Sequence, residues 1–236
     1  MRWQTRIAAA SVAVAIVATP AAATAHSLDS LEKQLFDREQ YFQTKDLPAP
    51  GFTLQDADGK AVDLSDLRGK VVILHFVYAS CPDVCPLHAE KLAEVQEMIA
   101  ITPMRDQVKF VTVTTDPKRD TPEVMREYGP LHGLDSANWM FLTSAPSEPE
   151  DRTRQLAEKY GLKFTGTDDG LQMHGTVTMV IDRESRWRAS FHGLAFNPTN
   201  LVLYVNALVN DVHTPGSRDA PAETFWQRIL SWFQRR

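Results

Sequence analysis

The feature that most constrains the fold is the segment 71–78, which is apolar at every position except His75. A strand exposed to water on one face alternates apolar and polar residues, so this run indicates a strand buried on both faces. His75 is then expected to be a hydrogen-bonded residue of the core. Further strands and helices alternate along the chain, which predicts an α/β fold with a central sheet covered by helices.

The expected elements follow from apolar periodicity and from turn and cap residues. An N-terminal β-hairpin is expected from 52–54 and 61–64. Further strands are expected at 108–114, 139–142, 176–181 and 187–191, and helices at 86–100, from Thr121 onward, at 149–160 and at 198–209. We expect the chain to divide into an export signal or membrane anchor (1–25), a lead-in helix (26–47), the main domain (48–212), a linker (213–222) and an amphipathic C-terminal helix (223–236).

The N-terminal segment has the pattern of an export signal. Arg2 and Arg6 form a basic start, an uncharged apolar run follows, and residues 23–25 fit a small-x-small cleavage site. An uncleaved membrane anchor is the alternative, because residues 7–25 carry no charge and about 20 residues span a bilayer. Both alternatives place the domain outside the cytosol, and we expect it in the periplasm, where disulfides persist.

The C-terminal segment 223–236 is expected to form an amphipathic helix. Its apolar face consists of Phe225, Trp226, Ile229, Leu230 and Phe233. It either binds a membrane surface or a partner, as interfacial helices do, or packs back onto the domain. The formal net charge of the chain is −5, which argues against a nucleic-acid partner.

The chain has only two cysteines, Cys81 and Cys85, placed where the buried strand gives way to a helix. Side chains four residues apart on a helix have Cβ atoms about 5–6 Å apart, so the two thiols can hold one soft metal ion or form a disulfide. A helix N-terminus favours the thiolate, which is the metal ligand and the nucleophile. The pair therefore predicts metal or redox chemistry.

Three segments, in this order, resemble the Sco/SenC family of copper-binding cytochrome oxidase assembly proteins. They are Cys81-Pro-Asp-Val-Cys85-Pro after the buried strand, Thr-Asp-Pro-Lys-Arg-Asp-Thr-Pro at 115–122, and His174 before a strand. The resemblance implies a thioredoxin-like fold that binds one copper ion, Cu(I) or Cu(II), through Cys81, Cys85 and His174. The implied partners are the copper-site subunit of a membrane-bound cytochrome oxidase and a periplasmic copper donor.

The sequence leaves alternatives for the identity of the metal and of the third ligand. Thiolates suit Cu(I) and imidazole extends the site to Cu(II), but zinc accepts the same ligands. His88, one helical turn after Cys85, is either a local third ligand or a solvated helix residue. Asp116 either supports the site or forms an Asp-Pro turn. Met173 and Gly175, on either side of His174, depart from the family's usual acidic and hydroxyl residues.

Two functions from different classes compete. The first is a copper metallochaperone, a binding and transfer protein more than an enzyme. The second is a thiol-disulfide oxidoreductase that reduces the cysteines of a copper-site precursor. Three residues separate the cysteines where thioredoxins have two, which argues against general disulfide exchange. A peroxidase is disfavoured because Leu74 and Tyr78 stand where peroxiredoxins need Pro and Thr or Ser.

Overall fold

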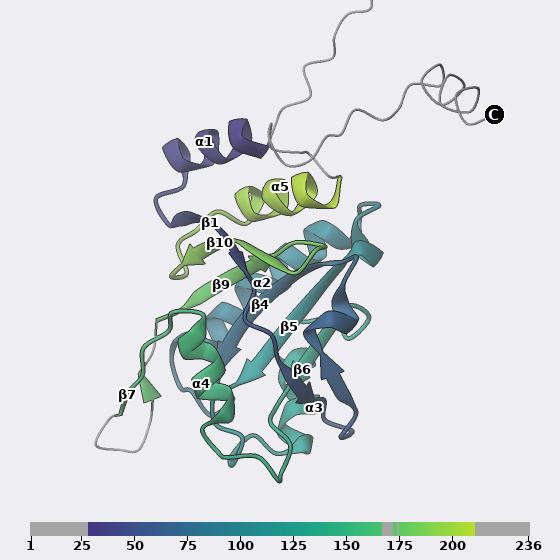
Figure 1. Cartoon of the computed structure of the whole chain (residues 1–236), viewed down its shortest axis with the longest axis vertical. Helices are drawn as coiled ribbons and strands as arrows, with labels where there is room; N and C mark the ends of the chain where they lie inside the picture. Colours follow the sequence, from purple (N-terminus) through teal and green to yellow (C-terminus); the bar gives the residue numbers. More distant parts are fainter. Residues whose placement is uncertain (1–27, 167–171, 174, 211–236) are drawn as a thin grey trace, which may run out of the picture.

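The centre of the molecule is a six-stranded mixed sheet with the strand order β1-β10-β9-β4-β5-β6 (Figure 1). The computed structural model describes residues 28–166, 172–173 and 175–210. Strands β4, β5 and β6 run parallel to one another, whereas β9 pairs antiparallel with β4 and β10, and β10 with β1. The strands of this sheet are β1 (Phe42–Pro48), β4 (Val71–Val77), β5 (Val108–Thr114), β6 (Trp139–Leu142), β9 (Val177–Ile181) and β10 (Arg186–His192).

Strand β4 is buried along its whole length, as the apolar run predicts. Its side chains alternate between two cores. Ile73 and Val77 belong to one hydrophobic cluster, and Leu74 and Phe76 belong to the other. The sheet is therefore covered on both faces, which confirms the expected α/β fold class.

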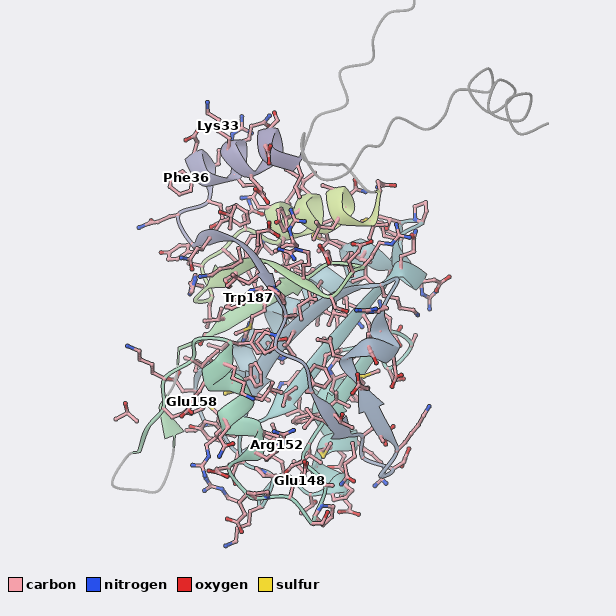
Figure 2. The ribbon with its side chains drawn as sticks, in the orientation of Figure 1. Lys33, Phe36, Glu148, Arg152, Glu158 and Trp187 are labelled. Atoms are coloured by element: carbon pink, nitrogen blue, oxygen red, sulfur yellow. The ribbon has the colours of Figure 1, made fainter. Side chains whose placement is uncertain are left out.

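Each face of the sheet has its own cover. Residues of α1, α2, α3 and α5 pack in the first cluster, and residues of α4, the β2–β3 hairpin and the 3₁₀ turn η1 pack in the second. In Figure 2, Trp187 of β10 lies on the face that carries α4, and its ring is 5.3 Å from that of Tyr160. The covering elements are α1 (Leu28–Arg38), β2 (Thr53–Gln55), β3 (Ala61–Asp63), η1 (Leu64–Leu67), α2 (Val84–Ala100), α3 (Pro122–Leu131), α4 (Arg152–Lys159) and α5 (Pro198–Val209).

Local cap residues explain where two of the helices begin. The Thr121 side chain accepts a hydrogen bond from the backbone N–H of Val124, and Pro122 opens α3. The Asn197 side chain accepts from the N–H of Thr199 at 2.9 Å, and Pro198 opens α5. A side-chain acceptor followed by proline satisfies the free N–H groups of a helix start, so these starts are fixed by sequence.

The expected lead-in helix is shorter than the pattern predicted. Helix α1 ends at Arg38, and 42–48 form the edge strand β1. Phe42 anchors this strand, with its ring 5.2 Å from Phe191 and 5.3 Å from Tyr204. Most of the other β1 residues are exposed, so the segment carries little apolar pattern and its pairing with β10 decides its conformation.

Several expected features lie outside the described residues. These are the export signal, the linker, the amphipathic C-terminal helix and His174. A short antiparallel pair that the sequence did not indicate, β7 (Thr165–Gly166) and β8 (Gln172–Met173), precedes β9. Across the part of the chain that the structure covers, no helix is both long enough and apolar enough to cross a membrane.

Candidate metal centre

Cys81 lies in the connection from β4 to α2, and Cys85 lies in the first turn of α2, both at the carboxyl edge of the parallel strands. The N–H of Cys81 donates to the carbonyl of Tyr78 at 3.0 Å, which turns the chain after the strand. Both thiols are free, with 6% of Cys81 and 3% of Cys85 exposed. Two reduced sulfur atoms are thus held near the surface but largely screened from water.

Helix α2 begins two residues earlier than the sequence indicated, at Val84 where position 86 was expected. Asp83 is the N-cap, and Cys85 is the second helical residue, so Pro86 is the third and not the first. The proline still fits, because the first four N–H groups of a helix have no intrahelical acceptor. This start leaves backbone N–H groups directed toward the cysteine loop.

The two thiols have different electrostatic surroundings. Burial opposes ionisation of Cys81, but hydrogen bonds from the N–H groups of Asp83 and Cys85 outweigh it, so the pKa of the Cys81 thiol is lowered. Burial raises the pKa of the Cys85 thiol, and the neighbouring Cys81 raises it further. Cys81 is therefore the more readily ionised thiol, and Cys85 reaches the thiolate state when a cation compensates its charge.

Asp120 accepts a hydrogen bond from the backbone of the cysteine loop, and this role was not predicted from the sequence. Its buried carboxylate accepts the N–H of Ala79 at 3.1 and 3.2 Å and the hydroxyl of Thr114. Burial raises the pKa of this carboxyl. Asp120 is the second aspartate of the 115–122 segment, but no pattern in the sequence links this residue to Ala79.

A tyrosine of α3 contacts the same loop. The Tyr128 hydroxyl donates to the carbonyl of Cys85 at 3.1 Å, and its ring is 4.6 Å from that of His132. His132 in turn lies 3.8 Å from the Glu90 carboxylate of α2. The start of α2 is thereby fastened to α3, which holds Cys85 in place.

Strand β9 brings a distant part of the chain to this edge. Thr178 pairs with His75 near the end of β4, and the Thr176 carbonyl accepts the N–H of Gly193 at 2.7 Å. Gly175 and Thr176 therefore approach the edge that carries the cysteine loop. His174 lies outside the described residues, so the implied third ligand stays a prediction from sequence.

His88 is a core residue and not a solvated one. It is 2% exposed, and its Nε2 is hydrogen-bonded to the Thr178 hydroxyl at 2.7 Å. Its ring lies 4.9 Å from that of His75, which in turn contacts the Thr112 hydroxyl at 3.3 Å. His75 is thus the hydrogen-bonded core residue that the sequence predicts.

Asp116 forms the turn that the Asp-Pro sequence indicates. Its carbonyl accepts the N–H groups of Arg119 and Asp120, at 3.2 and 3.0 Å. Its carboxylate pairs with the Arg119 side chain, and its N–H donates to the Thr114 hydroxyl at 2.9 Å. These contacts give Asp116 a structural role in the turn after β5.

The possible metal ligands among the described residues suit a soft ion. Among the described residues, no cluster of three His, Cys, Asp or Glu side chains could hold a metal ion. The two adjacent thiols are the only sulfur ligands cysteine supplies in this chain, and paired thiolates select Cu(I) or Zn²⁺ over hard cations. The residues present therefore fit copper, with a further ligand required from elsewhere.

The sequence matches the family model described as SCO1/SenC over residues 42–210. The chain belongs to the SCO1/SenC family. Among similar proteins is the SCO2-like protein RP587 of Rickettsia prowazekii, 30% identical over 169 residues, which span 70% of this chain and 80% of the relative. The family match covers the cysteine loop, the 115–122 segment and the position of His174.

Solved structures of Sco proteins show the same thioredoxin-like fold. The copper-bound ScoI of Bradyrhizobium japonicum aligns with a TM-score of 0.55 and 29% identity, covering 68% of this chain and 98% of that one. BsSco, described as a member of the Sco family of cytochrome c oxidase assembly proteins, aligns with a TM-score of 0.62 and 19% identity, covering 71% and 96%. The predicted family and fold class are confirmed.

Proposed function

We propose that this SCO1/SenC protein is a periplasmic copper metallochaperone that assists assembly of the copper centre of cytochrome oxidase. It binds one copper ion through the thiolates of Cys81 and Cys85 and the imidazole of His174. The observation that carries the proposal is the pair of free, nearly buried thiols at the start of α2, in a family with copper-bound members. Its partners are the copper-site subunit of the oxidase and a periplasmic copper donor.

The thiol surroundings support reversible binding. Backbone hydrogen bonds to the Cys81 sulfur lower the pKa of this thiol, which favours capture of the ion by Cys81 first. Cys85 is buried, so its thiolate is stabilised mainly by the bound cation, and protonation of this sulfur assists release. Such a site holds copper while it is loaded and returns to a neutral thiol when a partner removes the ion.

Metal titration of the anaerobically reduced protein tests the ligand set. We expect one copper per chain, and Cys81→Ser or Cys85→Ser should abolish tight Cu(I) binding. His174→Ala should weaken Cu(II) binding more than Cu(I) binding, since two thiolates still hold the softer ion. The matched control is His192→Ala, which removes an exposed imidazole at the end of β10. Unchanged Cu(II) spectra in His174→Ala would show that another residue is the ligand.

The redox state of the thiols gives a second test. An intramolecular Cys81–Cys85 disulfide removes both thiolates, so oxidised protein should not load copper until it is reduced. Copper uptake measured before and after treatment with a dithiol reductant separates the two states. Equal uptake by both would contradict a thiolate site.

The second candidate function is thiol-disulfide oxidoreductase, and the unequal thiols favour it. The ionised Cys81 would attack a client disulfide, and Cys85 would then resolve the mixed disulfide. The client gains two electrons as dithiol, and the protein keeps a Cys81–Cys85 disulfide. Cys85→Ser should then trap a covalent complex with a client and Cys81→Ser should not. Absence of any trapped complex would leave copper transfer alone.

A further inference from the structure

Tyr78 contacts both cysteines from the position where β4 gives way to the cysteine loop. Its carbonyl accepts the N–H of Cys81 at 3.0 Å. Its backbone N–H donates to the Cys85 sulfur, and its side-chain hydroxyl donates to the Cys81 sulfur. One residue is therefore hydrogen-bonded to the cysteine pair through both its backbone and its side chain.

The hydroxyl is the part of this arrangement that depends on the side chain at position 78. The backbone N–H groups of Asp83 and Cys85 also donate to the Cys81 sulfur, and they are present whatever side chains the loop carries. A phenylalanine at position 78 would keep the ring and the backbone hydrogen bonds and lose only the hydroxyl. Tyrosine therefore supplies a donor that the path of the backbone does not.

The ring of Tyr78 is held in the core, so the position of its hydroxyl is fixed. The residue is 4% exposed and packs in the first hydrophobic cluster with Val77, Cys81 and Cys85. Close packing keeps a buried side chain in one rotamer, and the hydroxyl of a buried tyrosine bonds to an acceptor within the protein. Here that acceptor is the Cys81 sulfur.

The hydrogen bonds of the site converge on one of the two sulfur atoms. The Cys85 thiol donates to the Cys81 sulfur, in addition to the donors already named. The other tyrosine at this edge, Tyr128, directs its hydroxyl to the Cys85 carbonyl at 3.1 Å. Tyr128 thus holds the backbone of α2, whereas Tyr78 acts on a sulfur atom.

A hydrogen bond to a thiolate sulfur stabilises its negative charge and draws electron density away from it. In the metal-free pair this favours the reduced thiols over the disulfide, whose sulfur atoms carry no charge. In a copper site it weakens electron donation by the sulfur, which destabilises Cu(II) more than Cu(I). Both effects favour the same state, reduced thiols with Cu(I).

We propose that Tyr78 is a positioning residue whose hydroxyl keeps the Cys81–Cys85 pair reduced and biases the site toward Cu(I). The effect on the thiols requires no metal. The effect on copper valence rests on the copper-binding function proposed above. The two effects are therefore tested separately, with the same pair of variants.

The equilibrium with glutathione in alkaline buffer tests the effect on the thiols. The protein disulfide takes two electrons from two glutathione thiols, which form glutathione disulfide. One of their protons goes to Cys85 and one to solvent, because Cys81 stays a thiolate. Tyr78→Phe should lower the equilibrium constant for reduction about tenfold, which is a shift of about 30 mV.

Tyr160→Phe is the matched control for this measurement. Tyr160 is also buried, but it packs on the opposite face of the sheet, and its hydroxyl donates to the Pro50 carbonyl at 3.0 Å. This variant should have the same equilibrium constant as the parent. An unchanged constant in Tyr78→Phe, or equal changes in both variants, overturns the proposal.

Absorption spectra and copper affinities test the effect on valence. Tyr78→Phe should move the sulfur-to-Cu(II) charge-transfer band to longer wavelength, and should raise Cu(II) affinity relative to Cu(I) affinity about tenfold. Tyr160→Phe should match the parent. An unchanged band and affinity ratio in Tyr78→Phe would overturn the bias toward Cu(I). A parent protein that binds no copper would contradict the proposed function instead, and the glutathione equilibrium would still decide the role of Tyr78.

Discussion

Replacement of His75 should remove part of the acid sensitivity of this fold. His75 is fully buried between β5 and α2, and burial together with the neighbouring His88 holds its pKa well below the ordinary 6.5. The unfolded chain binds a proton here that the folded chain does not, so stability is complete above about pH 6.5 and falls below it by about 1.4 kcal/mol per pH unit. Two pH units lower, at about pH 4.5, the accumulated loss reaches at most about 3 kcal/mol.

Urea unfolding followed by tryptophan fluorescence measures this loss. The free energy of unfolding of the parent and of His75→Gln is compared at several values between about pH 7.5 and 4.5. Glutamine keeps a polar partner for the Thr112 hydroxyl, which Trp139 also contacts at 2.8 Å. The variant is expected to be less stable near neutrality but to lose less stability on acidification.

The comparison between variants is needed because other titratable groups change the free energy of unfolding with pH in the opposite direction to His75. Burial raises the pKa of the Asp120 carboxyl, so that group favours folding as the pH falls. His192→Gln is the matched control. Partial burial and the nearby Lys45 charge lower the pKa of the His192 ring, which lies at the surface at the end of β10, and its removal should change the slope less. Identical pH slopes for the parent and His75→Gln would refute the assignment of a neutral buried histidine.

Three further substitutions test packing and buried polar contacts, each by the free energy of unfolding in urea. Gly129→Ala should cost about 1–3 kcal/mol, since a Cβ there would lie 2.3 Å from the Trp139 ring; no loss would mean that the ring moves freely. Asp120→Ala should cost about 2–3 kcal/mol and slow copper loading, because the N–H of Ala79 loses its acceptor. Glu39→Ala should cost about 2 kcal/mol, because the N–H of Asn197 and the side-chain amide of Asn200 lose their acceptor, and hydrogen exchange should show faster opening of the first turn of α5.

The parts of the fold that the sequence predicts are those with strong local signals. The apolar run gives β4, and Thr121 followed by Pro122 gives the start of α3. Strand β1 could not be predicted in this way, because its residues are mostly exposed and its conformation depends on hydrogen bonds to β10. Propensity is a weak guide for an edge strand, since pairing with a neighbour decides its structure.

In the candidate site, too, local features were predicted from the sequence and long-range contacts were not. Spacing alone brings Cys81 and Cys85 together, because only three residues of turn and helix separate them. The support from Asp120 and the hydrogen bond between His88 and Thr178 join segments far apart in the chain, so no local pattern contains them. The burial of His88 was missed because a histidine one turn after a cysteine is equally compatible with solvent, metal or core.

The strand order also determines when during folding the proposed copper site is completed. Strands β4, β5 and β6 follow one another along the chain, whereas β9 joins β4 only after all of them have been synthesised. Such long-range pairing forms late, because closing a long loop costs entropy before contacts compensate for it. If the domain is exported unfolded, as the proposed function implies, it carries both thiols before it has the neighbourhood of residues 175–176. Copper met at that stage would find two sulfur ligands without the rest of the site, so oxidation or premature loading is a hazard during folding as well.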